Sequence, residues 1–292
     1  MKKVMAIACV CVCLFLIGCG GGGASAKSNN PLDQFDLRAS RIDGIAGIAI
    51  TGYNGAPGRV TIPRELNRIP VRYIVGGFNG KKIFNVTIPE SVVSIGENAF
   101  NNNLLTSVII PNSVTTIGSS AFSNNLLNSI TIPNSVTTIG SSAFSSNLLT
   151  SITIPTSLTS IGAGAFSDNL LTSLTIPDSV TTIGGRAFSN NQLTSITIPA
   201  TLTTIGSGAF ADNSFTSLTI PANVTMIMDD AFSGCASLTS VTFEGNTRLQ
   251  YDGYSSAFPG DLVRKYLSGG IGKYTRPDGS NTWTKQEVLP QT

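Results

Sequence analysis

The feature that most constrains this chain is a verbatim internal repeat. Residues 110–123 read IPNSVTTIGSSAFS, and residues 132–145 read the same fourteen letters. When the chain is aligned on the dipeptide Ile-Pro, the prolines from Pro89 to Pro221 recur at one constant interval, at positions 89, 111, 133, 155, 177, 199 and 221. A fixed period of this length is typical of a solenoid, in which each unit stacks on its neighbours. A catalytic site needs a unique arrangement of side chains, so this repetition favours an extended surface.

The pattern inside one unit predicts short strands. In LTSITIP, residues 149–155, apolar and polar residues alternate, which indicates a short strand with one buried face, and Pro155 ends it. The segment SVTTIG that follows is a candidate for a second short extended segment. One glycine recurs in every unit, as expected for a turn that needs a positive φ or a close backbone approach. These glycines are Gly96, Gly118, Gly140, Gly162, Gly184 and Gly206.

Stacking the units brings equivalent residues into columns. We therefore expect a mostly β solenoid with a parallel β-sheet on one face, at about 4.8 Å between strands, and short strands, turns or 3-10 segments on the other. A buried phenylalanine column is predicted at Phe100, Phe122, Phe144, Phe166, Phe188, Phe210 and Phe232.

An asparagine recurs at one turn position of every regular unit. An asparagine side chain at a turn can bond neighbouring backbone groups, so we interpret this column as a structural ladder without a direct role in binding. Its members are Asn103, Asn125, Asn147, Asn169, Asn191 and Asn213. The next position in the column is Cys235, where the unit also gains one residue.

The outward-facing positions of the predicted strands form serine and threonine columns, which are the candidate binding face. They are Ser129, Ser151, Ser173 and Ser195, with Thr131, Thr153, Thr175, Thr197 and Thr219. Three interpretations remain open: a solvated β-face without a ligand, a broad adhesive face with many weak hydrogen-bonding groups, or a flat ice-binding threonine array. Serine and asparagine columns and an expected curvature of the sheet speak against the third.

Composition speaks against an enzyme. The chain has no histidine, which removes the commonest general base and the commonest metal ligand, and only 12% of its residues are charged. No phosphate loop or zinc spacing is present in the sequence. We therefore expect no catalytic residue, no cofactor and no metal. Cys235 is interpreted as a core residue in preference to a reactive thiol, and Trp283 as a plug for the last turn in preference to a contact anchor.

Charged residues gather at the two ends of the array. Residues 31–82 carry eight basic and four acidic residues, whereas residues 86–240 carry one basic and seven acidic residues. Capping turns need polar faces for solubility, and a basic binding patch at the N-terminal end is the alternative. The formal net charge of +2 gives no reason to expect a nucleic-acid partner.

The N-terminus reads as a targeting segment. Lys2 and Lys3 precede an apolar run, residues 4–17, which is shorter than a typical membrane-spanning helix. The run ends in LIGC, which resembles the lipobox of bacterial lipoproteins, so Cys19 is the expected lipidated residue. An ordinary signal peptide or an uncleaved anchor is the alternative. Residues 1–18 would be the signal peptide and residues 19–30 a Gly/Ser tether.

The repeat resembles a known family. The unit LTSITIPxSVTTIGxxAFxxN is similar to the BspA-like, or Treponema pallidum-type, leucine-rich repeat, whose pattern is LxxIxIPxxVxxIGxxAFxxC. Residues 215–243 fit this pattern closely, with Cys235 at the position of its cysteine. The other units carry asparagine there and are one residue shorter than the family's unit. Residues 47–63 resemble the leading segment of family members, and residues 257–285 resemble the tail of spirochaete members.

The resemblance implies a leucine-rich-repeat solenoid that acts as a surface adhesin. We divide the chain into an N-terminal cap with a divergent first repeat at 31–88, repeats at 89–243, and a C-terminal divergent repeat and cap at 244–292. The expected partners are host extracellular-matrix proteins or other surface proteins, with membrane contact through the lipid anchor. A monomer at the cell surface or outer membrane is favoured over a periplasm-facing protein. The alternative is a structural envelope lipoprotein without a host ligand.

Overall fold

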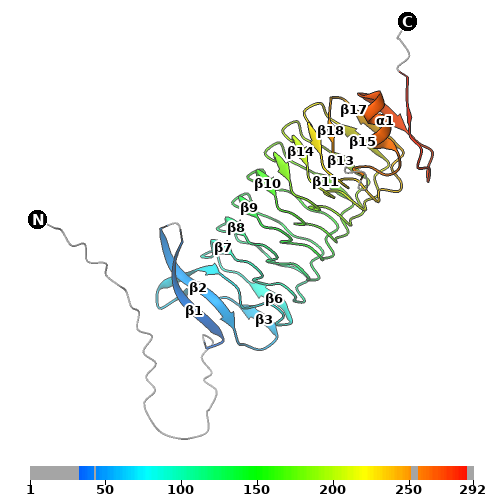
Figure 1. Cartoon of the computed structure of the whole chain (residues 1–292). Helices are drawn as coiled ribbons and strands as arrows, with labels where there is room; N and C mark the ends of the chain where they lie inside the picture. Colours follow the sequence, from blue (N-terminus) through cyan, green and yellow to red (C-terminus); the bar gives the residue numbers. More distant parts are fainter. Residues whose placement is uncertain (1–32, 43, 251–255, 288–292) are drawn as a thin grey trace, which may run out of the picture.

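The chain forms an elongated solenoid with a small cap at each end (Figure 1). The structure is a computed structural model, and it describes residues 33–42, 44–250 and 256–287. Within these residues the regular elements are twenty strands, many of only two residues, and one helix. The predicted parallel β-solenoid is therefore confirmed. The segments predicted at 1–18 and 19–30 lie outside the described residues.

The first series of strands lies at the segment that reads TI or SI in the regular units. Its members are β5 (Ile69–Ile74), β7 (Ser94–Ile95), β8 (Thr116–Ile117), β9 (Thr138–Ile139), β10 (Ser160–Ile161), β12 (Thr182–Ile183), β14 (Thr204–Ile205), β16 (Met226–Ile227) and β18 (Arg248–Leu249). Neighbours pair in parallel from β5 to β9 and from β10 to β18, and β9 lies against β10. This series forms the most continuous sheet of the solenoid.

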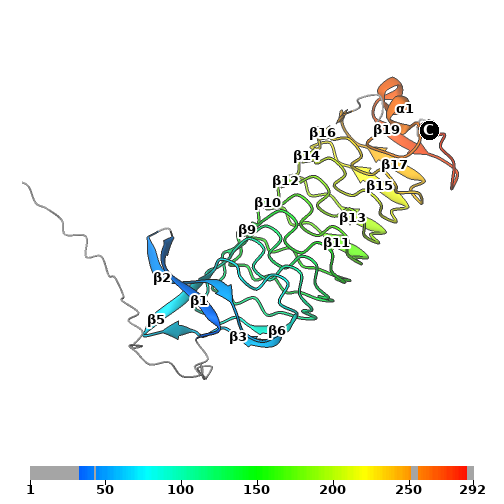
Figure 2. The ribbon, with the colours of Figure 1, turned by 60° about the horizontal axis from the view of Figure 1, so that its bottom comes forward.

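The second series follows the SIT tripeptide and runs along another side of the solenoid (Figure 2). Its members are β3 (Gly58–Thr61), β6 (Ile83–Thr87), β11 (Ser173–Thr175), β13 (Ser195–Thr197), β15 (Ser217–Ile220) and β17 (Ser240–Phe243). They pair in parallel as β3–β6, β11–β13 and β15–β17. Between β6 and β11 the ladder is reduced to one parallel bridge, Thr131 to Thr153. The continuous sheet expected on this side is thus interrupted.

A stack of aromatic rings runs through the centre of the molecule. From Phe100 to Phe232, consecutive rings lie 5.4–5.6 Å apart and are nearly parallel. The backbone of each turn is hydrogen-bonded to the next at this column, as in the 2.8 Å bond from the Phe122 N–H to the Ala143 carbonyl. The stack extends beyond the predicted column to Phe78 and Tyr53 at one end and to Phe258 at the other.

The recurring glycines are explained by close backbone approach. A Cβ added to Gly118 would lie 2.6 Å from the carbonyl carbon of Gly96 in the preceding turn, and Gly140 is crowded in the same way. The φ angles of these two residues are not in the positive range. Of the two reasons that the sequence allowed, the packing of one turn on the next is the one that applies.

Different elements close the two ends. At the N-terminal end, β1 (Phe35–Ile42) and β2 (Ile45–Tyr53) form an antiparallel hairpin that joins the first series through β5, to which β4 (Glu65–Leu66) also pairs. At the C-terminal end, β19 (Gly272–Thr275) and β20 (Thr284–Lys285) add antiparallel strands to β17. The helix α1 (Leu262–Gly269) covers this end with Leu262, Val263 and Tyr266.

Candidate functional site

The serine and threonine columns lie on one exposed strip, which we call the hydroxyl strip. All nine residues of the candidate binding face are exposed. In each turn the serine and the threonine are two positions apart, as in Ser129 and Thr131. On β11 and β13 they stand in register, with Ser173 beside Ser195 and Thr175 beside Thr197. Between them, Leu174 points into the core and is 6% exposed. The alternation read from the sequence therefore places the hydroxyl groups outward.

The strip offers hydrogen-bonding groups without charge. Its first turn is different, because Ile109 occupies the threonine position and is 83% exposed. An open depression of about 470 Å³ lies beside Ile109 and is lined by Ser107, Ser129 and Thr131 among others, with one charged residue, Glu90. A partner could therefore combine an apolar contact at this end with hydroxyl contacts along the rest of the strip.

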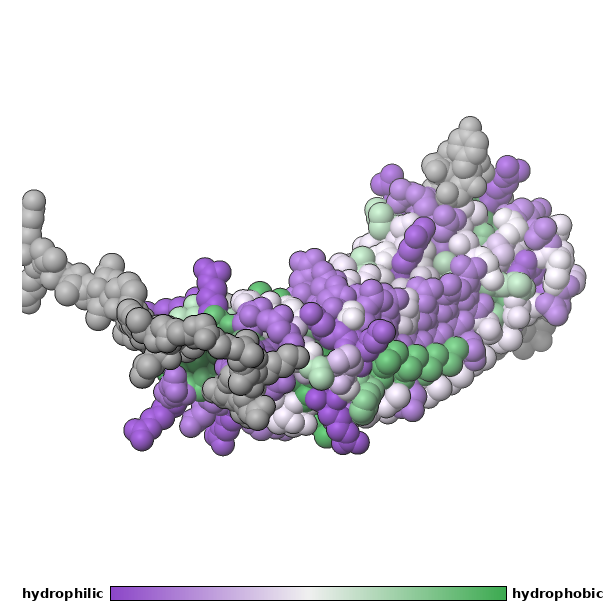
Figure 3. All heavy atoms as spheres, turned by 90° about the horizontal axis from the view of Figure 1, so that it is seen from below, coloured by the Kyte–Doolittle hydropathy of each residue, from purple (hydrophilic) through white to green (hydrophobic). Residues whose placement is uncertain are grey.

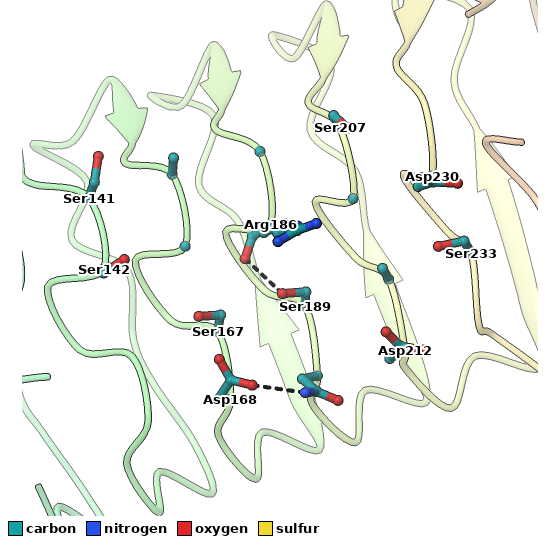
Figure 4. Close-up of a pocket in the computed structure, with 16 residues that line it drawn as sticks. Ser141, Ser142, Ser167, Asp168, Arg186, Ser189, Ser207, Asp212, Asp230 and Ser233 are labelled. Atoms are coloured by element: carbon teal, nitrogen blue, oxygen red, sulfur yellow. Dashed lines mark hydrogen bonds between the residues drawn. The ribbon is translucent and has the colours of Figure 1, made fainter. Parts of the chain in front are cut away.

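The sequence did not indicate a second surface, a polar trough of about 580 Å³ that crosses several turns (Figure 4). Its middle is marked by Arg186, which lies between Gly164 and Gly208 in the same column. A Cβ on Gly208 would lie 3.1 Å from Cγ of Arg186, so the arginine side chain occupies the space above that glycine. The alternation of glycine and larger residues in this column was the available signal.

Serines and three aspartates, Asp168, Asp212 and Asp230, line most of the rest of the trough. Asp168 accepts a hydrogen bond of 2.8 Å from the side-chain amide of Asn190, and the Ser189 hydroxyl donates to the Arg186 carbonyl at 3.1 Å. Both bonds join groups of the protein to one another, and neither activates a hydroxyl as a nucleophile. Across the described residues, no three His, Cys, Asp or Glu residues are grouped to hold a metal ion.

The asparagine column lies in the interior and ties the turns together. Nδ2 of Asn147 donates to the carbonyl oxygens of Phe122, Phe144 and Ser145 at 2.9, 3.1 and 3.2 Å. Its Oδ1 accepts a hydrogen bond of 3.1 Å from the backbone N–H of Leu127. One side chain thus satisfies backbone groups of its own turn and of the turn before it. The same four contacts recur at Asn125, Asn169, Asn191 and Asn213.

Cys235 and Trp283 are both buried. Burial raises the pKa of the Cys235 thiol to about 11, and its Sγ lies 3.5 Å from the Phe210 carbonyl oxygen. Trp283 is 1% exposed, and its indole N–H donates to the Pro259 carbonyl at 2.8 Å. Both residues therefore lie in the core, and neither is part of a surface that a partner could reach.

Besides Cys235, burial shifts the pKa values of three described residues, which lie in the caps of the solenoid. Burial raises the pKa values of Tyr53 in the N-terminal cap and Tyr274 in the C-terminal cap, and it lowers the pKa of Arg276. Groups with such shifts are often found at catalytic sites, but these three lie away from the hydroxyl strip and the trough.

The lipidation candidate, Cys19, falls outside the described residues, so the structure does not bear on it. Within the part of the chain that the structure describes, no helix has the length and apolar character needed to cross a membrane.

Comparison with solved structures gives several matches, of which the first supports the solenoid fold. A leucine-rich repeat protein from Bacteroides ovatus superposes with a TM-score of 0.56 at 23% identity, over 75% of this chain and 66% of the other. This chain thus spans less than two thirds of that protein. The Treponema pallidum leucine-rich repeat protein matches with 23% identity over 82% and 95% of the two chains, with a TM-score of 0.39. The pneumococcal vaccine antigen PcpA matches with 19% identity over 73% and 81%, with a TM-score of 0.47.

The comparison with curated proteins found no match. The family profile described as "BspA type Leucine rich repeat region" matches six copies, over residues 74–191 and 159–258. Together these ranges cover more than half of the chain. Proteins built from such repeats are generally non-enzymatic scaffolds for contacts with other proteins. The repeat pattern, the stacked turns and the profile match agree, and this chain belongs to the BspA-type leucine-rich repeat family.

Proposed function

We propose that this protein is a non-catalytic, lipid-anchored protein of the cell surface that binds other proteins through the hydroxyl strip. The observation that supports the proposal is the strip itself, in which exposed hydroxyl groups recur at two positions per turn without a charged neighbour in the columns. Many weak hydrogen bonds along a rigid array give a broad contact whose strength grows with the number of turns engaged.

The partner class follows from the family resemblance and from the lipobox-like LIGC segment. An exported, lipid-anchored scaffold meets the proteins of its surroundings, so host extracellular-matrix proteins or the surface proteins of other cells are the proposed ligands. Cys19 would carry the lipid, and the following Gly/Ser segment would hold the solenoid clear of the membrane.

The first test is location. Intact cells are treated with protease and the protein is followed by immunoblotting, with lysed cells as the reference. Loss of the protein from intact cells is expected. Protection in intact cells with digestion after lysis would contradict surface exposure and would favour the structural envelope lipoprotein.

The second test asks whether the hydroxyl strip carries the binding. Thr131, Thr153, Thr175 and Thr197 are replaced together by lysine, and binding to immobilised matrix proteins is compared with the unchanged chain. The matched control carries lysine at Thr137, Thr159, Thr181 and Thr203, which are exposed on the side of the first strand series. The strip variant should lose binding by at least tenfold, and the control should retain it. Equal binding by both variants would contradict the role of the strip.

A further inference from the structure

Four leucines form a hydrophobic row on the surface of the solenoid, which we call the leucine ridge. They are Leu104, Leu126, Leu148 and Leu170, one per turn, and they are 45%, 42%, 44% and 37% exposed. Figure 3 shows a continuous hydrophobic row along the solenoid, bordered by hydrophilic residues. Most other exposed large hydrophobic residues lie singly, so this row is the main regular apolar surface among the described residues.

The fold does not require leucine at these positions. In the next two turns the same column holds Gln192 and Ser214, and both are exposed. The core is supplied by the following residue of each turn, such as Leu105 and Leu127, which are fully buried. Leucine is therefore kept at four consecutive turns where the chain itself shows that a polar residue is tolerated. A hydrophobic row of this kind indicates a contact with another molecule.

The two ends of the ridge differ in charge. Lys81 and Lys82 lie in the turn just before Leu104, and Lys82 occupies the position equivalent to the leucines. At the opposite end, Asp168 and Asp212 are exposed in the column two residues before the ridge position. The ridge thus joins a basic end to an acidic end.

We propose that the leucine ridge is the contact between two copies of this chain, arranged side by side and antiparallel. The two-fold axis passes between Leu126 and Leu148, so that Leu104 packs against Leu170 of the partner subunit. A symmetric dimer of this kind uses the same surface twice, which a straight row of identical residues permits. The sequence alone predicts a monomer, and the ridge is the observation that changes this expectation.

Charge complementarity selects the antiparallel arrangement. With the axis at this place, the turn of Lys82 lies opposite the turn of Gln192 of the partner subunit. That turn lies between the turns of Asp168 and Asp212, so the basic end of each copy meets the acidic end of the other. A parallel arrangement would bring the two Lys82 side chains together, which is unfavourable. The inference concerns self-association and does not rest on the proposed binding function.

The contact is expected to be weak. Four partly exposed leucines with their flanking threonine and asparagine columns provide less than the ~800 Å² per partner of a standard interface. Interfaces of standard size range from micromolar to picomolar affinity, so a dissociation constant above about 1 µM is expected here. The charged ends should add a salt-dependent contribution, because exposed charges are screened within about 10 Å at 0.1 M salt.

The first test is sedimentation equilibrium of the full chain over a range of concentrations, compared with the double variant Leu126→Gln/Leu148→Gln. Both substitutions copy the residue found at Gln192, so the variant should fold, which circular dichroism verifies. The unchanged chain should show a dimer that weakens in high salt, and the variant should associate at least tenfold more weakly. The control Thr131→Gln/Thr153→Gln should dimerise as the unchanged chain does. A chain that stays monomeric, or a ridge variant that dimerises normally, would overturn the proposal.

The second test is orientation. The variants Leu104→Cys and Leu170→Cys are mixed and oxidised, and the linked peptides are identified by mass spectrometry, which separates them from links through the native cysteines. Antiparallel packing predicts a 104–170 link in the mixture and no 104–104 link in the first variant alone. A dominant 104–104 link would contradict the antiparallel arrangement. The ridge variants should still bind any matrix protein that the unchanged chain binds, which keeps this test separate from that of the hydroxyl strip.

Discussion

An interior turn and the last turn of the array use different residues to form hydrogen bonds with their buried backbone groups. In the turn of Asn147, one side chain bonds three carbonyl groups and one N–H group. In the turn of Cys235, the thiol makes one long contact with a carbonyl, at 3.5 Å, and has a backbone hydrogen bond with Asn213. An asparagine offers two donors and an acceptor, whereas a thiol is a weak donor and acceptor. The last turn therefore needs partners from elsewhere in the chain.

Arg276 supplies these partners. Its guanidinium donates to the carbonyl oxygens of Leu238 and Ala236 at 2.6 and 2.9 Å, and to that of Cys235 at 3.4 Å. It is 6% exposed and lies 5.1 Å from the ring centre of Trp283. The interior turns thus complete themselves with a local residue, while the end turn depends on a residue about forty positions further along the chain.

The largest expected effect comes from breaking an interior turn. Asn147→Ala leaves the Leu127 N–H without a partner, which costs about 1–3 kcal/mol. It also removes one of the hydrogen bonds that the Phe122, Phe144 and Ser145 carbonyls each accept, at about 0.5–1.5 kcal/mol per bond, while each carbonyl keeps another donor. We expect the free energy of unfolding to fall by about 3–5 kcal/mol, measured by urea denaturation. The control Ser146→Asn introduces the residue found at Asn124 and Asn190, and it should change the stability by less than about 0.5 kcal/mol. A loss below about 1 kcal/mol for Asn147→Ala would contradict the ladder.

Removing the arginine should have a smaller and more local effect. Arg276→Met keeps much of the side-chain volume but removes the charged hydrogen bonds to the last turn, with an expected cost of about 2–3 kcal/mol. Hydrogen exchange should become faster at residues 235–239 and remain unchanged around Asn147. Lys273→Met, an exposed position on β19, is the control. Uniformly faster exchange along the whole solenoid would show that the two regions are not independent.

High pH should weaken the last turn through Cys235. Burial raises the pKa of Cys235 to about 11, compared with 9.0 for an unperturbed thiol. The neutral thiol is favoured in the folded state, so its contribution to stability is complete below pH 9 and is lost as the pH rises from 9 through 11. Urea denaturation of the unchanged chain and of Cys235→Ala at pH 8, 9 and 10 should show a steeper decline for the unchanged chain. Parallel curves would contradict this assignment.

The smallest effect is expected when the end turn receives the interior residue. Cys235→Asn adds hydrogen-bonding groups, but the turn is one residue longer and Arg276 already holds its carbonyls, so we expect a change within about 1 kcal/mol. The reciprocal variant Asn147→Cys should lower the free energy of unfolding several times more than Cys235→Asn changes it. If Cys235→Asn instead raised the free energy of unfolding by well over about 1 kcal/mol, the longer turn would accept an asparagine as well as the interior turns do.

The periodic residues made the solenoid predictable, because a column of identical residues at a fixed spacing can only be buried by stacking. The proline, glycine and phenylalanine columns all follow from this argument. The interrupted ladder near Thr131 was not predictable, because the alternation of side chains is the same whether or not neighbouring strands are close enough to bond.

The caps and the surfaces were harder to predict from the sequence. Phe78 lies one repeat length before Phe100 and could have been added to the column, whereas Phe258 breaks the spacing. Arg276 carries no local signal of burial, since its partners are far away in the sequence. The hydroxyl strip was visible as two columns of outward residues. The trough was not, because its character depends on which columns are adjacent in space. The leucine ridge was not, because in a pair such as Leu104 and Leu105 the sequence does not show which leucine faces outward.

The self-completing interior turns have a consequence for how this molecule can change length. Residues 110–123 and 132–145 are identical, and each interior turn presents its neighbours with the same bonds through its asparagine. An unequal exchange between the two copies in the gene would add or remove one whole unit without creating a new junction. Both caps would be untouched, and the far end of the molecule would move by one turn, about 5 Å. The length of the solenoid can thus be changed one turn at a time by selection, without a change in the residues of the surface that makes contact.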